Sequence, residues 1–177
     1  MPIEIERKFL VLDDSWRAQA QRVVPMAQGY LNDEVAADGS PLKISVRVRL
    51  EGDEARLNLK SREAGRSRLE FDYAIPAEDA RAMLDRCVGG LVDKRRHYVE
   101  HAGHVWEVDE FLGDNAGLVV AEVELDDHDE TFARPAWLGT EVTDAQRYYN
   151  LALAMRPFSR WSEAERAGSD LESPSCS

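Results

Sequence analysis

Three charged side chains alternate with apolar ones at the start of the chain. In the stretch EIERK, Glu4, Glu6 and Lys8 are spaced two residues apart. This is the period of a β-strand, so all three side chains point to one face of a strand predicted over residues 2–11. Two carboxylates can hold a divalent cation, and an ammonium group can contact an anion. The alternative is an ordinary solvated strand face, and recurrence of the pattern decides between them.

The same alternation recurs along the chain and predicts eight strands in all. The other seven lie near residues 26–32, 42–51, 54–63, 67–76, 92–101, 104–112 and 118–126. Turn sequences such as EGDE and HAGH separate neighbouring strands, as in antiparallel hairpins. Helices are predicted over residues 13–24, over residues 77–88 and after a capping box at residues 143–146. This organisation predicts an antiparallel sheet, which eight such strands could close into a barrel, with helices packed outside it.

The charges on the polar strand faces are sorted by strand. Three strands are rich in acids: Glu4, Glu6, Glu107, Asp109, Glu122 and Glu124. Three others are rich in bases: Arg47, Arg49, Lys60, Lys94 and Arg96. A face that served only solubility would intersperse the two signs. In a closed sheet an acidic wall would face a basic wall, and this setting suits divalent cations that bridge a polyanion.

Composition and length exclude several classes of function. The chain has 177 residues, of which 44% are hydrophobic and 32% charged, and its formal net charge is −12. This balance argues against a nucleic-acid-binding surface. No apolar run is long enough to span a bilayer, no secretory signal is evident, and the two cysteines form no disulfide framework. We therefore expect a cytoplasmic protein that binds neither nucleic acid nor membrane.

We expect one domain over residues 1–158. Residues 159–177 end in a serine-rich polar sequence, which predicts a C-terminal tail that is partly disordered.

In their order along the chain, these motifs resemble the CYTH, or triphosphate tunnel metalloenzyme, superfamily, and most of all its short bacterial inorganic triphosphatases. The resemblance rests on E-x-E-x-K at residues 4–8, QGYL at 28–31, the R-x-R of Arg47 and Arg49, Lys60, Glu70, Lys94 and Arg96, VDEF at 108–111 and the E-x-E of Glu122 and Glu124. The ending EVTDAQRYYN at 141–150 is similar to the terminal helix of the short members. The match spans residues 2–156 in order.

The resemblance implies an α+β, mainly β fold: a closed eight-stranded antiparallel barrel whose tunnel holds a triphosphate and Mg²⁺ or Mn²⁺. It implies metal ligands at Glu4, Glu6, Asp109, Glu122 and Glu124. It implies substrate-binding groups at Lys8, Arg47, Arg49, Lys60, Lys94 and Arg96. Glu4, Glu6, Lys8 and Asp109 would carry catalysis. Further candidates are Glu70, Asp72, which stands where a glutamate is expected, Glu107, and Arg147, which would help to close one tunnel mouth.

The function implied is a metal-dependent hydrolase that cleaves inorganic triphosphate to pyrophosphate and phosphate, as a monomer or homodimer. Alternatives within the enzyme class are nucleoside triphosphate hydrolysis, cyclisation of ATP as in class IV adenylyl cyclases, and hydrolysis of thiamine triphosphate. Two alternatives are not enzymes. One is a non-catalytic module that binds polyphosphate or a nucleotide, and the other is an acidic β-domain for protein interaction. The sequence leaves the substrate, the metal and the oligomeric state open.

Overall fold

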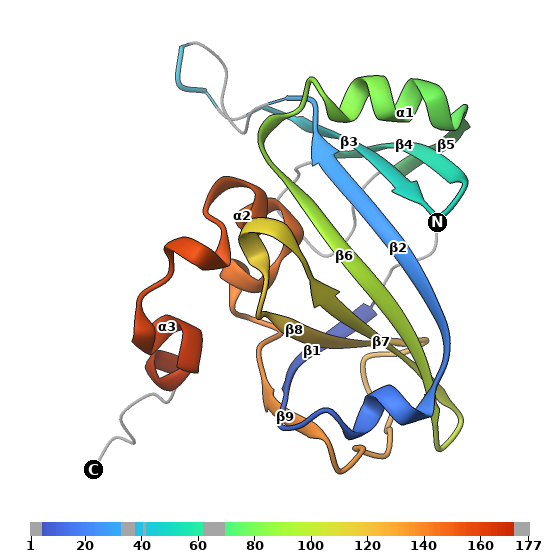
Figure 1. Ribbon diagram of the computed structural model, residues 1–177, viewed down its shortest axis with the longest axis vertical. Coiled ribbons are helices and arrows are strands. Elements are labelled where there is room, and N and C mark those ends of the chain that lie inside the picture. Colours follow the sequence, from blue (N-terminus) through green and yellow to red (C-terminus); the bar gives the residue numbers. More distant parts are fainter. Residues whose placement is uncertain (1–4, 33–37, 41, 62–69, 172–177) are drawn as a thin grey trace.

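The computed structural model describes residues 5–32, 38–40, 42–61 and 70–171 and confirms a mainly β architecture. Nine strands form one antiparallel sheet in the order β5-β4-β3-β2-β6-β7-β8-β1-β9 (Figure 1). The strands are β1 (Ile5–Val11), β2 (Ala20–Tyr30), β3 (Ile44–Glu51), β4 (Glu54–Ser61), β5 (Glu70–Ile75), β6 (Val88–His101), β7 (His104–Phe111), β8 (Val119–Leu125) and β9 (Leu138–Glu141). The helices are α1 (Ala77–Leu84), α2 (Asn150–Met155) and α3 (Glu163–Ala167).

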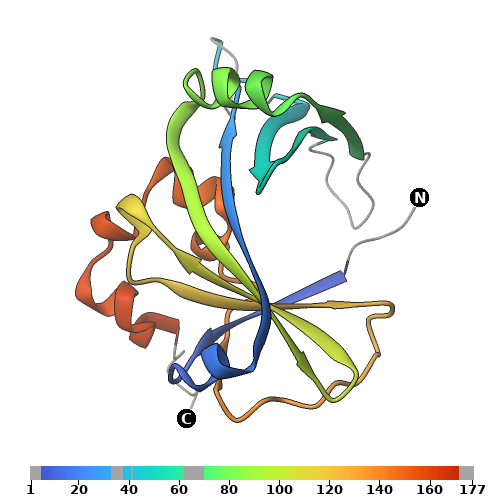
Figure 2. The same ribbon diagram turned by 45° about the vertical axis from the view of Figure 1, so that its right-hand side comes forward.

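Strands β2 and β6 run the length of the molecule and join two parts of the sheet (Figure 2). On β2, strand β3 pairs with the last five residues only, Met26–Tyr30. Its other edge pairs with β4, which in turn pairs with β5. Strand β7 pairs with β6 over Lys94–His101 and continues into β8 and β1. We call the first part the β3–β5 arm. The sheet is strongly curved, so residues on the same face of the arm and of the β7, β8 and β1 part point in different directions (Figure 2).

The predicted closed eight-stranded barrel is wrong. Among the described residues, β5 pairs only with β4, and no pairing joins it to β1 or β9. The second edge of β1 is occupied instead by β9, through Phe9 opposite Glu141 and Val11 opposite Leu138. The hydrogen bond from Val142 N to the Lys8 carbonyl, 2.8 Å long, extends this contact. Strand β1 therefore has a partner on each edge, β8 and β9, and no free edge to which β5 could pair. Within the described residues, β5 and β9 are the two edge strands of an open sheet.

Apolar residues cover one face of the sheet and one end of the other face. On one face, α1 packs on Val48 and Ala55, while Phe9, Trp16 and Trp106 build a second cluster farther along. The opposite face carries the charged residues. On that face, Val92 of β6 and Phe111 of β7 belong to a third apolar cluster, which also includes Leu153 of α2 and Trp161. The C-terminal helices therefore cover one end of the charged face.

Local structure differs from the sequence prediction in three places. The helix predicted over residues 13–24 is only a short 3₁₀ turn, Ser15–Gln19, since β2 already begins at Ala20. The helix predicted over residues 77–88 is α1, but it ends at Leu84. The capping box at residues 143–146 is wrong: the helix begins at Asn150 and has no side-chain cap, while the Thr143 hydroxyl donates a 2.7 Å hydrogen bond to Glu141.

No helix among the described residues is both long and apolar enough to cross a membrane. The boundary between a domain of residues 1–158 and a tail of residues 159–177 stays a prediction.

Candidate active site

A buried ion cluster lies where β6 and β7 pair on the charged face. Asp109 is fully buried and stands opposite Arg96 in the register of the two strands. Its Oδ2 accepts a 2.5 Å hydrogen bond from Lys94 Nζ, and its two oxygens each accept a 2.7 Å bond from Arg96. Burial alone would raise the pKa of Asp109, but the charges of Lys94 and Arg96 lower it to about 2. The carboxylate therefore stays ionised and holds both basic groups.

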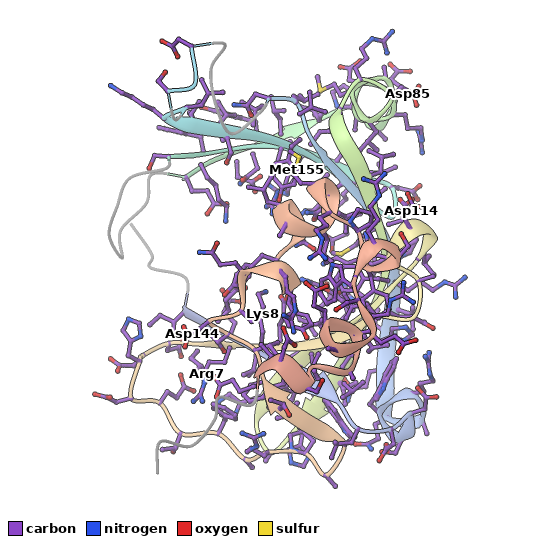
Figure 3. The ribbon with its side chains drawn as sticks, turned by 90° about the vertical axis from the view of Figure 1, so that its left-hand side faces the viewer. Arg7, Lys8, Asp85, Asp114, Asp144 and Met155 are labelled. Carbon is purple, nitrogen blue, oxygen red and sulfur yellow. The ribbon has the colours of Figure 1, made fainter. Side chains whose placement is uncertain are left out.

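Lys8 on β1 forms the centre of a second cluster, in the middle of the molecule (Figure 3). It is 3% exposed, and its Nζ donates a 2.5 Å hydrogen bond to Glu122 and lies 3.2 Å from Glu6 Oε1. Burial would lower the pKa of Lys8, but the two carboxylates raise it above its ordinary value. Lys8 is therefore a fixed positive charge between two acids.

The segment after β9 supports Lys8 in a way that the sequence did not reveal. The Lys8 backbone N–H donates a 3.0 Å hydrogen bond to Thr143 Oγ1. The Lys8 ammonium lies 4.6 Å from the ring centroid of Tyr149, a cation–π distance. The Tyr149 hydroxyl donates a 2.7 Å bond to the Thr143 carbonyl. In the sequence Tyr149 is only one residue of the segment EVTDAQRYYN, and its spacing from Thr143 carries no signal of this contact.

Arg96 joins the two clusters. Its Nη2 lies 3.4 Å from Glu122 Oε2, and its Nη1 donates to Glu107. Burial raises the pKa of Glu107, and Arg96 offsets part of that rise. Next to Arg96 is a cavity of about 60 Å³, which we call the acidic cavity; it is lined by Glu6, Arg96, Glu107, Glu122, Val123 and Glu124.

The β3–β5 arm brings further bases to the same face. Burial lowers the pKa of Arg49, and the like charges of Arg47 and Arg96 lower it further. Arg49 has a weak partner, with 3.8 Å between its Nε and Glu51 Oε2. Lys60 lies 3.3 Å from Glu70 farther along the arm. Arg47 and Arg49 therefore bring positive charge to this face, and Glu51, Glu70 and Asp72 offset part of it.

The structure brings most of the predicted site residues together. Seven of them form the joined clusters: Glu6, Lys8, Lys94, Arg96, Glu107, Asp109 and Glu122. Glu124 lines the acidic cavity, and five residues lie on the β3–β5 arm: Arg47, Arg49, Lys60, Glu70 and Asp72. Asp72 is bound to Arg56 at 2.7 Å. Glu4 lies outside the described residues.

Arg147 is not brought to these clusters. Its guanidinium binds Asp170, with 2.7 Å between Nη2 and Oδ1, and lies over the rings of Tyr148 and Trp161. These partners belong to the C-terminal segment, so the contacts of Arg147 serve the packing of that segment.

A larger cavity of about 410 Å³ lies on the other side of β1. Its lining includes Glu6, Arg7, His128, Glu141 and Asp144. Arg7 is already bound to Glu141, with 2.7 Å between Nε and Oε1. Acids thus outnumber free bases there, and this cavity suits a triphosphate less well than the charged face does.

Comparison with known proteins agrees with this geometry. The profile of the CYTH domain family matches residues 2–152. The chain belongs to the CYTH family. The family resemblance drawn from the E-x-E-x-K and R-x-R motifs is thereby confirmed.

Two curated relatives of this CYTH domain are named inorganic triphosphatase. The one from Acetivibrio thermocellus is 40% identical over 161 residues, which cover 90% of this chain and 98% of the relative. The one from Nitrosomonas europaea is 36% identical over 155 residues, covering 86% and 97%. A crystal structure of an inorganic triphosphatase superposes with a TM-score of 0.66 at 33% identity and covers 88% of this chain and 96% of that one.

The donors around the acidic cavity of the CYTH domain fit a hard divalent cation. Glu6, Glu107, Glu122 and Glu124 offer carboxylate oxygens, which Mg²⁺ and Mn²⁺ prefer. Within the described part of the chain, no three Asp, Glu, His or Cys side chains converge as a complete metal site. The donor chemistry fits a metal, therefore, although the described residues alone form no full coordination shell.

Proposed function

We propose that this CYTH domain hydrolyses inorganic triphosphate to pyrophosphate and phosphate on its charged face. The observation that carries the proposal is the joined cluster of Lys8, Lys94, Arg96 and their acids, together with Arg47 and Arg49 on the same face of the sheet. Two curated relatives with this activity in their names, each covered almost along its full length, support the choice of substrate.

The basic residues bind the phosphate oxygens in this proposal. Arg47 and Arg49 offer guanidinium forks on the β3–β5 arm, and Lys60 adds a point charge. Lys8 on β1 and Lys94 and Arg96 on β6 lie on the same face of the sheet as these groups. The carboxylates that already bind these three groups hold them in place, so little side-chain entropy is lost when the substrate binds.

A divalent cation, Mg²⁺ or Mn²⁺, would be held by Glu6, Glu122 and Glu124 together with Glu4. Mg²⁺ commonly shares one or two protein carboxylates with substrate phosphates, so it can bind together with the triphosphate without a full set of ligands from the described residues. When bound, the metal supplies charge neutralisation on the phosphoryl oxygens. Asp109, the fifth predicted ligand, is already held by Lys94 and Arg96, and in our proposal it orients these two groups.

The attacking water is placed in the acidic cavity, whose volume of about 60 Å³ admits at least one water. Glu107 lines this cavity, and because burial raises its pKa, it accepts a proton more readily than Asp109 does. Phosphoryl transfer otherwise asks mainly for positioning and charge neutralisation. All lining residues of this cavity except Val123 are charged. A charged lining favours an inorganic substrate over a nucleotide, whose nucleobase needs an apolar surface.

The test is a substrate panel with the purified chain and Mg²⁺ or Mn²⁺. Tripolyphosphate, ATP and thiamine triphosphate are compared by release of orthophosphate, and ATP also by formation of cyclic AMP. We expect orthophosphate release to be fastest from tripolyphosphate. Cyclic AMP with pyrophosphate would indicate a cyclase, and tight binding without turnover on any substrate would indicate a binding module. A cytoplasmic location and a monomeric or homodimeric state stay predictions.

A further inference from the structure

The side-chain amide of Gln28 on β2 is buried without a partner. Gln28 is 2% exposed, and its Nε2 has no hydrogen-bond acceptor among the described residues. Buried amide groups in proteins are nearly always hydrogen-bonded, so an unpartnered one requires an explanation. A bound ligand or a bound water would supply the missing acceptor.

Gln28 lies beside basic residues on the charged face. It stands directly opposite Arg49 on β3, and Tyr30, two residues on, stands opposite Arg47. On its other side Gln28 stands opposite Val92 of β6, and Lys94 is a diagonal neighbour, opposite Met26. Opposite residues in an antiparallel pair point to the same face, with Cβ atoms about 5 Å apart. Gln28 therefore has a guanidinium-bearing neighbour on the β3 side and lies beside the apolar end of the face on the β6 side.

A second donor in this place also lacks an acceptor. The Nε of Arg47 is buried and has no hydrogen-bond partner within the described part of the chain. Burial lowers the pKa of Arg49, and the like charge of Arg47 lowers it further, while Glu51 and Asp72 offset part of that drop. Two buried donors without acceptors among the described residues, Gln28 Nε2 and Arg47 Nε, therefore lie on the same face, next to the guanidinium of Arg49. An anion bound there would accept from both donors and would interact with both arginines, whereas a lone water would interact with them only as a neutral group.

We propose that Gln28 is a further substrate-binding residue, whose Nε2 donates a hydrogen bond to a phosphate oxygen that Arg47 and Arg49 also hold. This inference rests on the proposed function in that the anion is the triphosphate. An amide adds a donor without adding charge, so it directs the anion to one position among groups that attract it from several. Its burial next to the apolar cluster that contains Tyr30 and Val92 keeps that donor out of bulk water.

The experiment compares Gln28→Met with a matched control, Gln21→Met. Both glutamines lie on β2, but Gln21 is exposed and its amide donates to Glu100. Thermal unfolding without ligand and calorimetric titration with tripolyphosphate, with Mg²⁺ and separately with EDTA, are measured for both. Replacing an unpartnered buried donor by an apolar group of similar volume is neutral or stabilising. We therefore expect an unchanged or higher Tm for Gln28→Met but a Kd raised about tenfold, since the lost bond is to a charged acceptor.

Gln21→Met should change neither quantity. A Gln28→Met protein with a wild-type Kd would overturn the proposal, whether its Tm rises or falls. If that variant fails to fold, Gln28→Glu serves instead, because it keeps the shape, can pair with Arg49 and repels phosphate. A wild-type Kd in Gln28→Glu would likewise overturn it.

The two proposals fail separately. A wild-type chain that binds tripolyphosphate without hydrolysing it refutes the proposed function, while the Gln28 comparison still holds as a test of binding. A wild-type chain that hydrolyses tripolyphosphate and a Gln28→Met variant with the same Kd refute only the role of Gln28. A chain that binds no tripolyphosphate under either condition refutes both.

Discussion

Replacing Asp109 by asparagine removes the counter-charge of two buried basic groups. Asp109 is 0% exposed and Lys94 2%, so neither water nor salt can screen the charge that remains. Asparagine keeps the size of the side chain, so the change tests charge more than packing. We expect the variant to fold but with a clearly lower free energy of unfolding.

The magnitude follows from the burial and the pKa. The pKa of Asp109 falls from 3.8 to about 2, which corresponds to about 2 kcal/mol in favour of the ionised form at neutral pH. Removing one partner of a buried ion pair costs about 3–5 kcal/mol, because the other charge is left alone. Arg96 keeps Glu107 and Glu122 as partners, which reduces the loss. We therefore expect Asp109→Asn to cost about 3 kcal/mol.

The assay is urea unfolding of the wild type, Asp109→Asn, Lys94→Met and the double variant at neutral pH. Because the double variant leaves no lone buried lysine, it should lose less than the sum of the single variants, with a coupling of about 2 kcal/mol. The Arg56–Asp72 pair, whose side chains are 40% and 39% exposed, is the matched control. Its own cycle should give a coupling below about 1 kcal/mol. Equal coupling in the two cycles would refute the reasoning.

Three further predictions concern pH and substrate binding. The pKa of Asp109 is lowered in the folded state, so its contribution to stability is complete above about pH 4 and is lost as the pH falls toward 2. The urea midpoint of the wild type should therefore fall more steeply over this pH range than that of Asp109→Asn. Parallel curves for the two proteins would contradict this prediction. Arg49→Ala should raise the KM for tripolyphosphate about tenfold with kcat changed little, and a wild-type KM in steady-state kinetics would exclude its role in binding. Tyr149→Leu should lower kcat/KM about threefold to thirtyfold, because the ring lies 4.6 Å from the Lys8 ammonium, whereas Tyr149→Phe keeps the ring and should stay close to wild type; equal losses in both variants would show that the ring is not what matters.

The strands could be predicted from sequence because alternation reports directly which side chains share a face. Alternation does not report which edges pair, and the prediction of a closed barrel was wrong for that reason. Strand β9 has only four residues, LGTE, too few to show a pattern. It is a strand because the edge of β1 pairs with it, and the same pairing leaves the sheet open.

The charged site was predictable where charge itself carried the signal. Alternation and charge singled out Lys8, Glu122, Arg96 and Asp109 as site residues, but they did not predict that Lys8 binds Glu122 and that Arg96 binds Asp109. The uncharged contributors, Gln28 and Tyr149, gave no such signal, because their roles depend on what tertiary packing places beside them. Arg147 is a charged residue for which charge was misleading: it was a site candidate, but it binds Asp170 in the C-terminal segment.

The most direct test of the central claim compares Glu6→Gln with Glu110→Gln in hydrolysis of tripolyphosphate with Mg²⁺. Glu6 lines the acidic cavity, whereas Glu110 faces away from it and binds Arg17 at 3.0 Å. The account predicts that Glu6→Gln loses at least about a hundredfold in turnover while its unfolding curve stays close to wild type, and that Glu110→Gln keeps its turnover. Wild-type turnover in a folded Glu6→Gln protein would contradict it.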